Sequence, residues 1–495
     1  VCMTFDSLAK PTLRVGNWSS QLALPNMSKS FSDIPLAYEG GAVNVREEND
    51  LSNNPYELHD QLRLALGGIY KTSIQLDDPK QPEVSFVWLT DQKEAARILR
   101  NDDEIWVKGP TTFEPFHSLV PKHIIGLEGD SHSKMRRSAM LALNSHIDDR
   151  ISGIVQKHVR ELDEKHIKPT LAEGLTCTNI DKVIRSMALD IVSESIFGEP
   201  WGAIKDYSKR NIKAFSLSEI MHQLHWRVAD LRKRSWRYEN REEPVNELLK
   251  PLESYIHKMI EEKRQEQCPP EESMLSHWLS LTPKLSDDEL YNLCMTFLTM
   301  GHENVATAVS WFIILLSEHP QVQDELRAEL YEKAISLDDV MGAEALPKQI
   351  AAFYETVRLF PSVPALTRMP LQDTEVCGYA IPKHQEVFIN LYGCHRDIEI
   401  WGNDAERFKL SRFEDPNSCP YLSTKGLPDA ASFGVGGRAC LGRPLSMVEM
   451  RATVSFLLLK YEIKSVRKEK TKARNFISLR PGSHEIVFIP LTSKV

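Results

Sequence analysis

The longest segment with a helical pattern of apolar residues extends from Ser286 to about Leu316. Ser286 and Glu289 have the spacing of a capping box, so we expect the helix to begin directly after Ser286. The apolar positions then recur every three or four residues, as at Leu290, Leu293 and Phe297. Gly301-His302-Glu303 interrupts this pattern at its centre. A glycine and a carboxylate are unfavourable inside a buried helix, so these residues are candidates for a functional role.

Three other segments have the same period. A helix should begin just after Cys440, with Pro444 in its first turn, where proline is tolerated. Another opens near Pro347 and closes before Pro361. The third carries an inward-facing stripe that we interpret as core: Ile180, Ile184, Met187 and Ile191.

The N-terminal part has a different pattern. Residues 1–53 are polar, rich in proline and without a period, which predicts an irregular lead-in. A short helix from Asn54-Pro55 and strands over 69–76 and 84–89 predict a small sheet, and short strands return after Glu462. Because residues from about 131 to 459 look mostly helical, we expect a mainly α fold with small antiparallel β-sheets.

Composition excludes some function classes. The 495 residues are 42% hydrophobic and 26% charged, which is ordinary for a soluble globular chain. A net charge of -9 at pH 7, without a dominant basic block, argues against a nucleic-acid partner. The eight cysteines show no paired spacing, which is typical of reduced thiols in a cytosol-facing protein.

The most informative segment is the loop before the last helix, Phe433-Gly-Val-Gly-Gly-Arg-Ala-Cys440-Leu-Gly442. Its glycines let the backbone approach a ligand closely, and Arg438 offers a donor fork for a carboxylate. Cys440 precedes a helix N-terminus, where free amides and the dipole favour a thiolate. Such a thiolate is a metal ligand or a nucleophile. The aromatic residue, the glycines and the arginine together suit a haem iron, with Arg438 on a propionate.

Two other interpretations of the loop explain less. A buried, inert cysteine is the usual fate of a lone Cys, but it leaves the remaining residues of the loop unexplained. Gly434-x-Gly436-x-x-Ala439 is similar to a dinucleotide fingerprint, yet no clear strand precedes it and no βαβ unit surrounds it.

The loop resembles, at every defining position, the haem-ligand loop of the cytochrome P-450 superfamily, Phe-x-x-Gly-x-Arg-x-Cys-x-Gly, in its eukaryotic microsomal form. The resemblance implies one large haem domain over residues 54–495. It also implies haem b, with Cys440 as the axial iron ligand and Phe433, Arg438 and Gly442 as cofactor-binding residues. Since the chain has no flavin or nicotinamide motif, a separate NADPH-cytochrome P-450 reductase or a ferredoxin would supply electrons.

Glu355-Thr-Val-Arg358 lies on the helix that closes before Pro361. Three residues apart, the two side chains share a face, and such a pair is ordinarily a weak surface interaction. With the following Leu359-Phe360-Pro361, however, the pair resembles the Glu-x-x-Arg helix of the family, where a third arginine completes a buried structural network. Arg412 is the expected third member, although Leu410 stands where the family usually has proline and Arg407 offers a competing alignment.

Two further segments resemble the propionate-binding positions of the family. His132 and Arg136 are four residues apart on one helical face, so both can reach the same carboxylate. Arg368 follows the Glu-x-x-Arg helix at the distance usual for a second propionate contact. Without the resemblance, each of these residues is equally consistent with a surface cation.

By the same resemblance, the helix after Ser286 is the distal helix that crosses the haem. Gly301 would leave room for dioxygen and Glu303 would organise distal water, but Asn304 stands where the family has a threonine. An amide does not readily relay a proton as a hydroxyl does. Proton delivery would therefore pass through ordered water, through Glu303 or through Thr307, or the reaction would not need it.

We therefore expect haem-thiolate monooxygenation of a small, largely apolar molecule, such as a secondary metabolite or terpenoid. Asn304 favours an alternative, an isomerase or dehydratase acting on peroxides or an oxidative coupling enzyme. A non-catalytic haem or lipid carrier would have no use for a buried Glu303. By analogy with the family, the pocket would be lined by residues 106–116, 297–301, 363–366 and 478–479.

No apolar segment approaches the roughly 18 residues of a membrane-spanning helix, and the longest candidate is 309–316. The sequence begins at Val1 rather than at methionine, so an N-terminal anchor removed from it stays an open alternative. With such an anchor we expect the cytosolic face of the endoplasmic reticulum membrane, and otherwise the cytoplasm.

Overall fold

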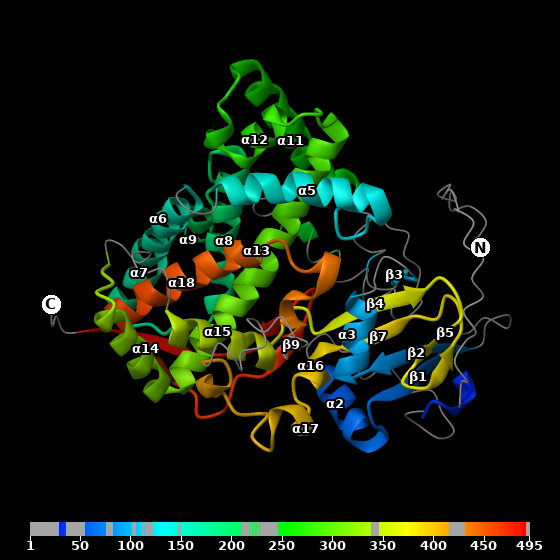
Figure 1. The fold of residues 1–495 in the computed structure, drawn as a ribbon. Coiled ribbons are helices and arrows are strands. Elements are labelled where there is room, and N and C mark those ends of the chain that lie inside the picture. The colour runs from blue at the N-terminus through cyan, green and yellow to red at the C-terminus, as the bar shows by residue number, and fades with distance from the viewer. Residues whose placement is uncertain are drawn as a thin grey trace.

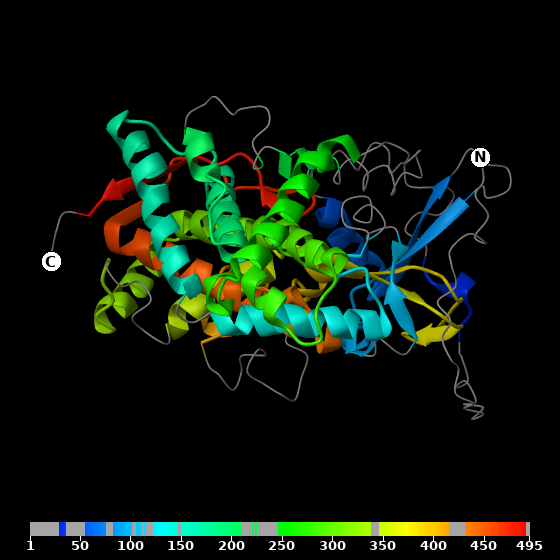
Figure 2. The ribbon, with the colours of Figure 1, turned by 90° about the horizontal axis from the view of Figure 1, so that it is seen from above.

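The computed structural model describes residues 29–35, 55–75, 83–100, 105–110, 122–146, 150–208, 246–337, 346–414 and 431–491, with isolated positions between 113 and 227. Helices gather on one side of the molecule and the largest sheet lies on the other, as both ribbon views show (Figures 1 and 2). The prediction of a mainly α fold with small sheets is therefore confirmed.

The largest sheet has five strands in the order β1-β2-β7-β4-β3. Their bounds are β1 Ile69–Gln75, β2 Glu83–Leu89, β3 Trp106–Lys108, β4 Ala365–Pro370 and β7 Val387–Asn390. All neighbours pair antiparallel except β2 and β7, which run parallel with Val87 opposite Val387. Because 297 residues separate β2 from β7, the connection is long enough for either direction. The expected antiparallel pairing thus has one exception, which local pattern could not reveal.

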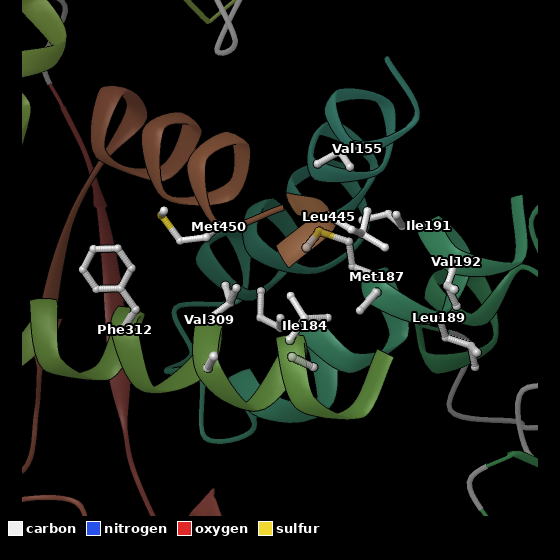
Figure 3. Close-up of a cluster of buried hydrophobic side chains, with 14 of the residues drawn as sticks. Val155, Ile184, Met187, Leu189, Ile191, Val192, Val309, Phe312, Leu445 and Met450 are labelled. Carbon is white, nitrogen blue, oxygen red and sulfur yellow. The ribbon is translucent and has the colours of Figure 1, made fainter. Parts of the chain in front are cut away.

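The helical core is built around α13 (Asp287–Glu318), which begins at the Ser286 capping box expected from the sequence. It packs against α8 (Ile180–Phe197) and α18 (Arg443–Lys460), and α6 (Ser152–Leu162) packs against both of these. The close-up shows their apolar side chains meeting: Val155, Ile184, Met187, Val309, Phe312, Leu445 and Met450 (Figure 3). The predicted stripe from Ile180 to Ile191 belongs to this core.

The remaining elements surround this core and the sheet. The helices are α2 Pro55–Leu66, α3 Gln92–Arg100, α5 Gly129–His146, α7 Lys168–Ala172, α9 Ala203–Ser208, α11 Asn246–Glu266, α12 Met274–Ser280, α14 Pro320–Glu332, α15 Pro347–Leu359, α16 Leu391–Cys394 and α17 Ile398–Trp401. Three two-stranded sheets pair β5 (Thr374–Val376) with β6 (Tyr379–Ile381), β8 (Tyr461–Ser465) with β11 (Ile486–Pro490), and β9 (Ala473–Asn475) with β10 (Leu479–Pro481).

Most of the expected lead-in over residues 1–53 lies outside the described residues. The exception is 29–35, where Phe31–Asp33 forms a short 3-10 helix and Lys29 bridges to Tyr379. Among the described helices, none combines the length and the apolar character that crossing a bilayer requires.

Candidate haem site

The loop around Cys440 is closed by its own backbone. The Cys440 amide donates to the Phe433 carbonyl at 2.7 Å, and the Ala439 amide donates to Gly436 at 3.1 Å. Gly436 has a φ of +69°, and a Cβ there would lie 3.2 Å from the Leu99 carbonyl oxygen on α3. Glycine is therefore needed at this position both for its conformation and for the close approach to α3.

The Cys440 thiol has the surroundings of a metal-binding thiolate. The amides of Gly442 and Arg443 hydrogen-bond to it, and together with the charges of Arg136 and Arg443 they act to lower its pKa, but burial outweighs them and raises the pKa overall. Cys440 is nevertheless an exposed residue by its own accessible surface. A side chain that is both accessible and deep faces an internal space, as a large flat ligand on the sulfur requires.

One face of α13 borders an internal space as well. From Leu290 to Ser317 the residues are buried, with the exceptions of Met300, Gly301 and Asn304, which are partly exposed. These three share one side of the helix because of its 3.6-residue period. The side-chain oxygen of Asn304 is buried and has no hydrogen-bond partner among the described residues. It can therefore accept a hydrogen bond from a ligand or from water.

Glu303, the next residue of interest on α13, lies in a different environment. Its carboxylate accepts hydrogen bonds from Arg185 Nη1 at 2.6 Å and from Arg480 Nε and Nη2 at 2.8 and 2.7 Å. Ser478 Oγ donates a further bond to it at 2.5 Å. The side chain is 2% exposed. The structure thus gives Glu303 a fixed role as the shared anion of two arginines, which sequence reasoning missed because neither arginine is near it in the chain.

Thr307 is part of the same cluster. Its hydroxyl lies 2.8 Å from Ser478 Oγ. Because Ser478 gives its hydrogen to the Glu303 carboxylate, Thr307 must be the donor in this pair. The hydroxyl of Thr307 is therefore oriented toward Ser478 and is not free to donate elsewhere while this arrangement holds.

Gly301 has a packing reason for being glycine. A Cβ at this position would lie 2.9 Å from Cγ2 of Val192 on α8, which is shorter than ordinary contacts allow. The close crossing of α13 and α8 therefore demands a glycine, independently of any room for dioxygen.

Segments that we expected to line a pocket meet beside α13. Ser362 Oγ donates to the Asn304 carbonyl at 2.8 Å, and the Leu479 amide donates to the Ser362 carbonyl at 2.9 Å. Trp311 donates to the Leu479 carbonyl at 2.8 Å. These bonds hold α13, the segment after α15 and the turn before β10 together. Of residues 106–116, the fourth expected segment, 106–110 and Phe113 are described, and the other five lie outside the described residues.

The expected propionate-binding residues come from three elements. His132 is buried on α5, and Arg368 is buried on β4, where its Nη1 donates to the Thr367 carbonyl at 2.8 Å. Burial lowers the pKa of Arg136, on which the charges of Cys440 and Arg438 also act, so these three groups lie near one another.

Arg438 binds a carboxylate in this structure, but that of Glu128, a residue the sequence did not single out. It also donates to the Leu127 carbonyl at 2.6 Å. The other oxygen of Glu128 accepts from the amide of Lys108, which pairs with Arg368 in the sheet. The described donors of Arg438 thus bind a carboxylate of the protein itself, and its contact with a propionate stays a prediction.

The Glu355 network is complete. Arg358 donates from Nε and Nη2 to the two carboxylate oxygens at 2.7 and 2.8 Å, and both side chains are 0% exposed. Arg412 Nε forms an ion pair with Glu355 at 3.3 Å. Among the described residues, the side chain of Arg407, the competing candidate, makes no ion pair with Glu355, and its backbone carbonyl accepts from Arg358 at 3.4 Å. Arg412 is therefore the third arginine of this network.

Comparison with known proteins gives the same picture. A stretch of 307 residues is 27% identical to "Cytochrome P450 714B3" of Zea mays and covers 59% of this chain and 54% of that protein. Another of 399 residues is 24% identical to "Cytochrome P450 monooxygenase ptmK" of Penicillium ochrochloron, covering 76% and 78%. A third of 441 residues is 23% identical to "Cytochrome P450 704C1" of Pinus taeda, covering 80% and 83%.

The family profile "Cytochrome P450" matches residues 52–488, which include every site residue discussed above. This family implies a haem iron. The residues present fit that cofactor: the Cys440 thiol is accessible and receives two backbone amides, and Arg438 binds a carboxylate. Sequence, geometry and profile therefore agree that the chain belongs to the cytochrome P450 family.

Proposed function

We propose that this protein is a haem-thiolate monooxygenase that oxidises a small, largely apolar molecule, such as a secondary metabolite or a terpenoid. The observation that carries the proposal is the Cys440 thiol, which is accessible, lies deep in the protein and receives two backbone amides. Haem b bound there would allow dioxygen to oxidise the substrate. The Cys440 thiolate would donate electron density to the iron, which favours O–O cleavage. Electrons from NADPH would arrive through NADPH-cytochrome P-450 reductase or a ferredoxin.

The residues of this chain would hold the cofactor from several sides. Cys440 would bind the iron, with Phe433 and Gly442 forming the loop around it. Arg438, Arg368, His132 and Arg136 would bind the two propionates. The partly exposed side of α13 would face the substrate, with Met300 offering an apolar contact and Asn304 a hydrogen-bond acceptor.

Proton handling would differ from that of a family member with a threonine at position 304. Glu303 is held by two arginines, and Thr307 donates toward Ser478, so neither offers a free proton to the pocket. Asn304 is left as the group that can hold a water molecule there. We propose that water on Asn304 delivers protons; in an Asn304→Thr variant the share of electrons lost as peroxide should change, and an unchanged share would exclude Asn304 from this role.

The Glu303 carboxylate is bound by two arginines, and position 304 carries an amide. Both features also favour a second candidate, an isomerase or dehydratase that acts on peroxides and needs no proton relay. Incubation of the purified haem protein with a panel of organic hydroperoxides, without NADPH and reductase, separates the two. Turnover that requires NADPH and reductase supports the monooxygenase, whereas rapid rearrangement of a hydroperoxide alone supports the second candidate.

The haem assignment itself is tested without turnover. We expect the purified protein to show a haem absorption band that shifts when small apolar ligands displace water from the iron. Cys440→Ser should change the spectrum of the bound haem, and an identical spectrum would contradict the assigned ligand. Cys394→Ser, at a buried thiol 46 residues earlier in the chain, is the matched control and should leave the spectrum unchanged.

Localisation follows from the class of protein that is proposed. A form with an N-terminal anchor would lie on the cytosolic face of the endoplasmic reticulum membrane, and a form without one in the cytoplasm. Fractionation of cells that express the full natural protein would distinguish the two.

A further inference from the structure

Glu449 on α18 is a buried carboxyl group with an oxygen that no described residue satisfies. The residue is 1% exposed, and its Oε1 has no hydrogen-bond partner among the described residues. No ion pair to it is formed in the described part of the chain either, in contrast to Glu303 and Glu355. A buried charge without a partner costs several kcal/mol, so the group must be neutral, bound to something other than protein, or both.

A second unsatisfied group lies one helical turn further along α18. Thr453 is 0% exposed, and its Oγ1 has no hydrogen-bond partner among the described residues. Threonines inside helices commonly donate to the carbonyl four residues earlier, as Thr356 does to Ala352 at 2.9 Å. Thr453 makes no such bond. Residues four apart lie on the same side of a helix, so Glu449 and Thr453 share one side of α18.

The surroundings exclude most ligands. Leu445, one turn before Glu449, and Met450, next to it, belong to the apolar core that α18 forms with α13 and α8 (Figure 3). Within the described residues no group of three or more metal-binding side chains exists, which argues against a cation. An apolar ligand would leave both polar groups unsatisfied. Water remains, because it can both donate and accept and is small enough for a packed interior.

We propose that Glu449 and Thr453 together bind a buried water molecule, and that Glu449 is a neutral carboxylic acid. The acid O–H and the threonine hydroxyl supply two of the two to four hydrogen bonds that such a water normally makes. Ser310 on α13, which packs against α18, has a third buried hydroxyl without a partner among the described residues. The inference does not depend on the proposed reaction.

The protonation state agrees with this geometry. Burial raises the pKa of Glu449 well above its ordinary value, and no neighbouring charge opposes this effect. This direction favours the protonated form of the carboxyl group, which can donate a hydrogen bond, as a carboxylate cannot.

Infrared difference spectroscopy of the haem-loaded protein tests the neutral acid. At neutral pH we expect the C=O band of a protonated carboxylic acid that disappears in Glu449→Gln. Glu406→Gln, at a side chain that is 67% exposed, is the matched control and should leave the band in place. Absence of the band in the unmodified protein, or its persistence in Glu449→Gln, overturns the proposal.

A double-mutant cycle tests the shared water. Thr453→Val removes the hydroxyl at nearly constant volume, and we expect it to raise the unfolding equilibrium constant roughly 2- to 10-fold, as for one lost hydrogen bond. In a Glu449→Leu background, where the site can no longer hold water, the same change should have little effect. If Thr453→Val has the same effect in both backgrounds, Glu449 and Thr453 do not share a water molecule.

Thr356→Val provides the control for this cycle, since that hydroxyl has a protein partner. Its effect should be the same in the unmodified protein and in the Glu449→Leu background. If Glu449→Leu fails to fold, a crystal structure of the unmodified haem protein decides. Water within hydrogen-bond distance of both groups supports the proposal, and a dry contact or a single-partner water contradicts it.

Discussion

Two buried carboxylates, Glu303 on α13 and Glu355 on α15, are each held by two arginines, yet they are built differently. Glu355 takes its main partner, Arg358, from the same helix three residues on. Glu303 takes Arg185 from 118 residues earlier and Arg480 from 177 residues later. The Glu355 network consists of a pair within one helix and one distant arginine. The Glu303 network forms only where three segments distant in the chain meet.

The comparison shows how the two networks depend on the rest of the fold. Glu355 and Arg358 lie on α15 itself, and Arg412 is the distant member of the network. The Glu303 cluster instead ties α8 and the turn before β10 to the centre of α13. A buried ion pair is no guarantee of net stability, but removing one partner leaves an uncompensated charge. Substitutions of single arginines therefore distinguish the two networks.

Arg358→Met should have the largest effect, because Arg358 is fully buried and donates twice to Glu355. We expect a loss of about 4–5 kcal/mol in the free energy of unfolding, measured by denaturant titration. Arg264→Met is a matched control, since Arg264 pairs with Glu261 at the same spacing and the two side chains are 42% and 56% exposed. A loss as small as that of the control would show that the Glu355 pair behaves as a surface pair.

Arg480→Met should cost less, about 3 kcal/mol, because Arg185 still neutralises Glu303 and Arg480 is slightly exposed. The same denaturant titration measures it. Arg474→Met, at the exposed residue opposite Arg480 in the β9–β10 pair, should have little effect. Equal losses for these two variants would mean that the Glu303 cluster does not depend on Arg480.

Ser478→Ala should cost about 2 kcal/mol, as for one hydrogen bond to a charged group. Because Thr307 loses its acceptor in this variant, Thr307→Val should cost less in the Ser478→Ala background than in the unmodified protein. Thermal unfolding of the four proteins measures this coupling. Strict additivity would contradict the hydrogen-bond order from Thr307 through Ser478 to Glu303.

The smallest effect concerns Asp404, an acidic neighbour of Arg412 in the Glu355 network. Hydrogen bonds from Arg412 and Lys409 lower the pKa of Asp404 from 3.8 to about 2. Since the folded pKa lies below the ordinary value, this contribution is present above about pH 4 and is lost as the pH falls toward 2. Unfolding titrations between pH 5 and 2 should therefore show a slightly weaker acid sensitivity in Asp404→Asn, and identical profiles would contradict the assignment.

Much of the fold was visible in local patterns. The predicted strands over 69–76 and 84–89 became β1 and β2, and the capping box at Ser286 marks the start of α13. These features depend on residues a few positions apart, and so does the close spacing of Cys440, Arg438 and the glycines of its loop. Pattern therefore suffices to find them.

The sequence by itself determined the family loop around Cys440, the helix that begins after Ser286 and the Glu355–Arg358 pair, because each is specified by neighbours in the chain. Only the tertiary structure decided which arginines hold Glu303, that Glu128 lies on Arg438, that Val192 requires glycine at 301 and that β2 runs parallel to β7. Each of these contacts joins residues far apart in the chain. Packing sets such contacts, and a single sequence carries no local signal of which partners will meet.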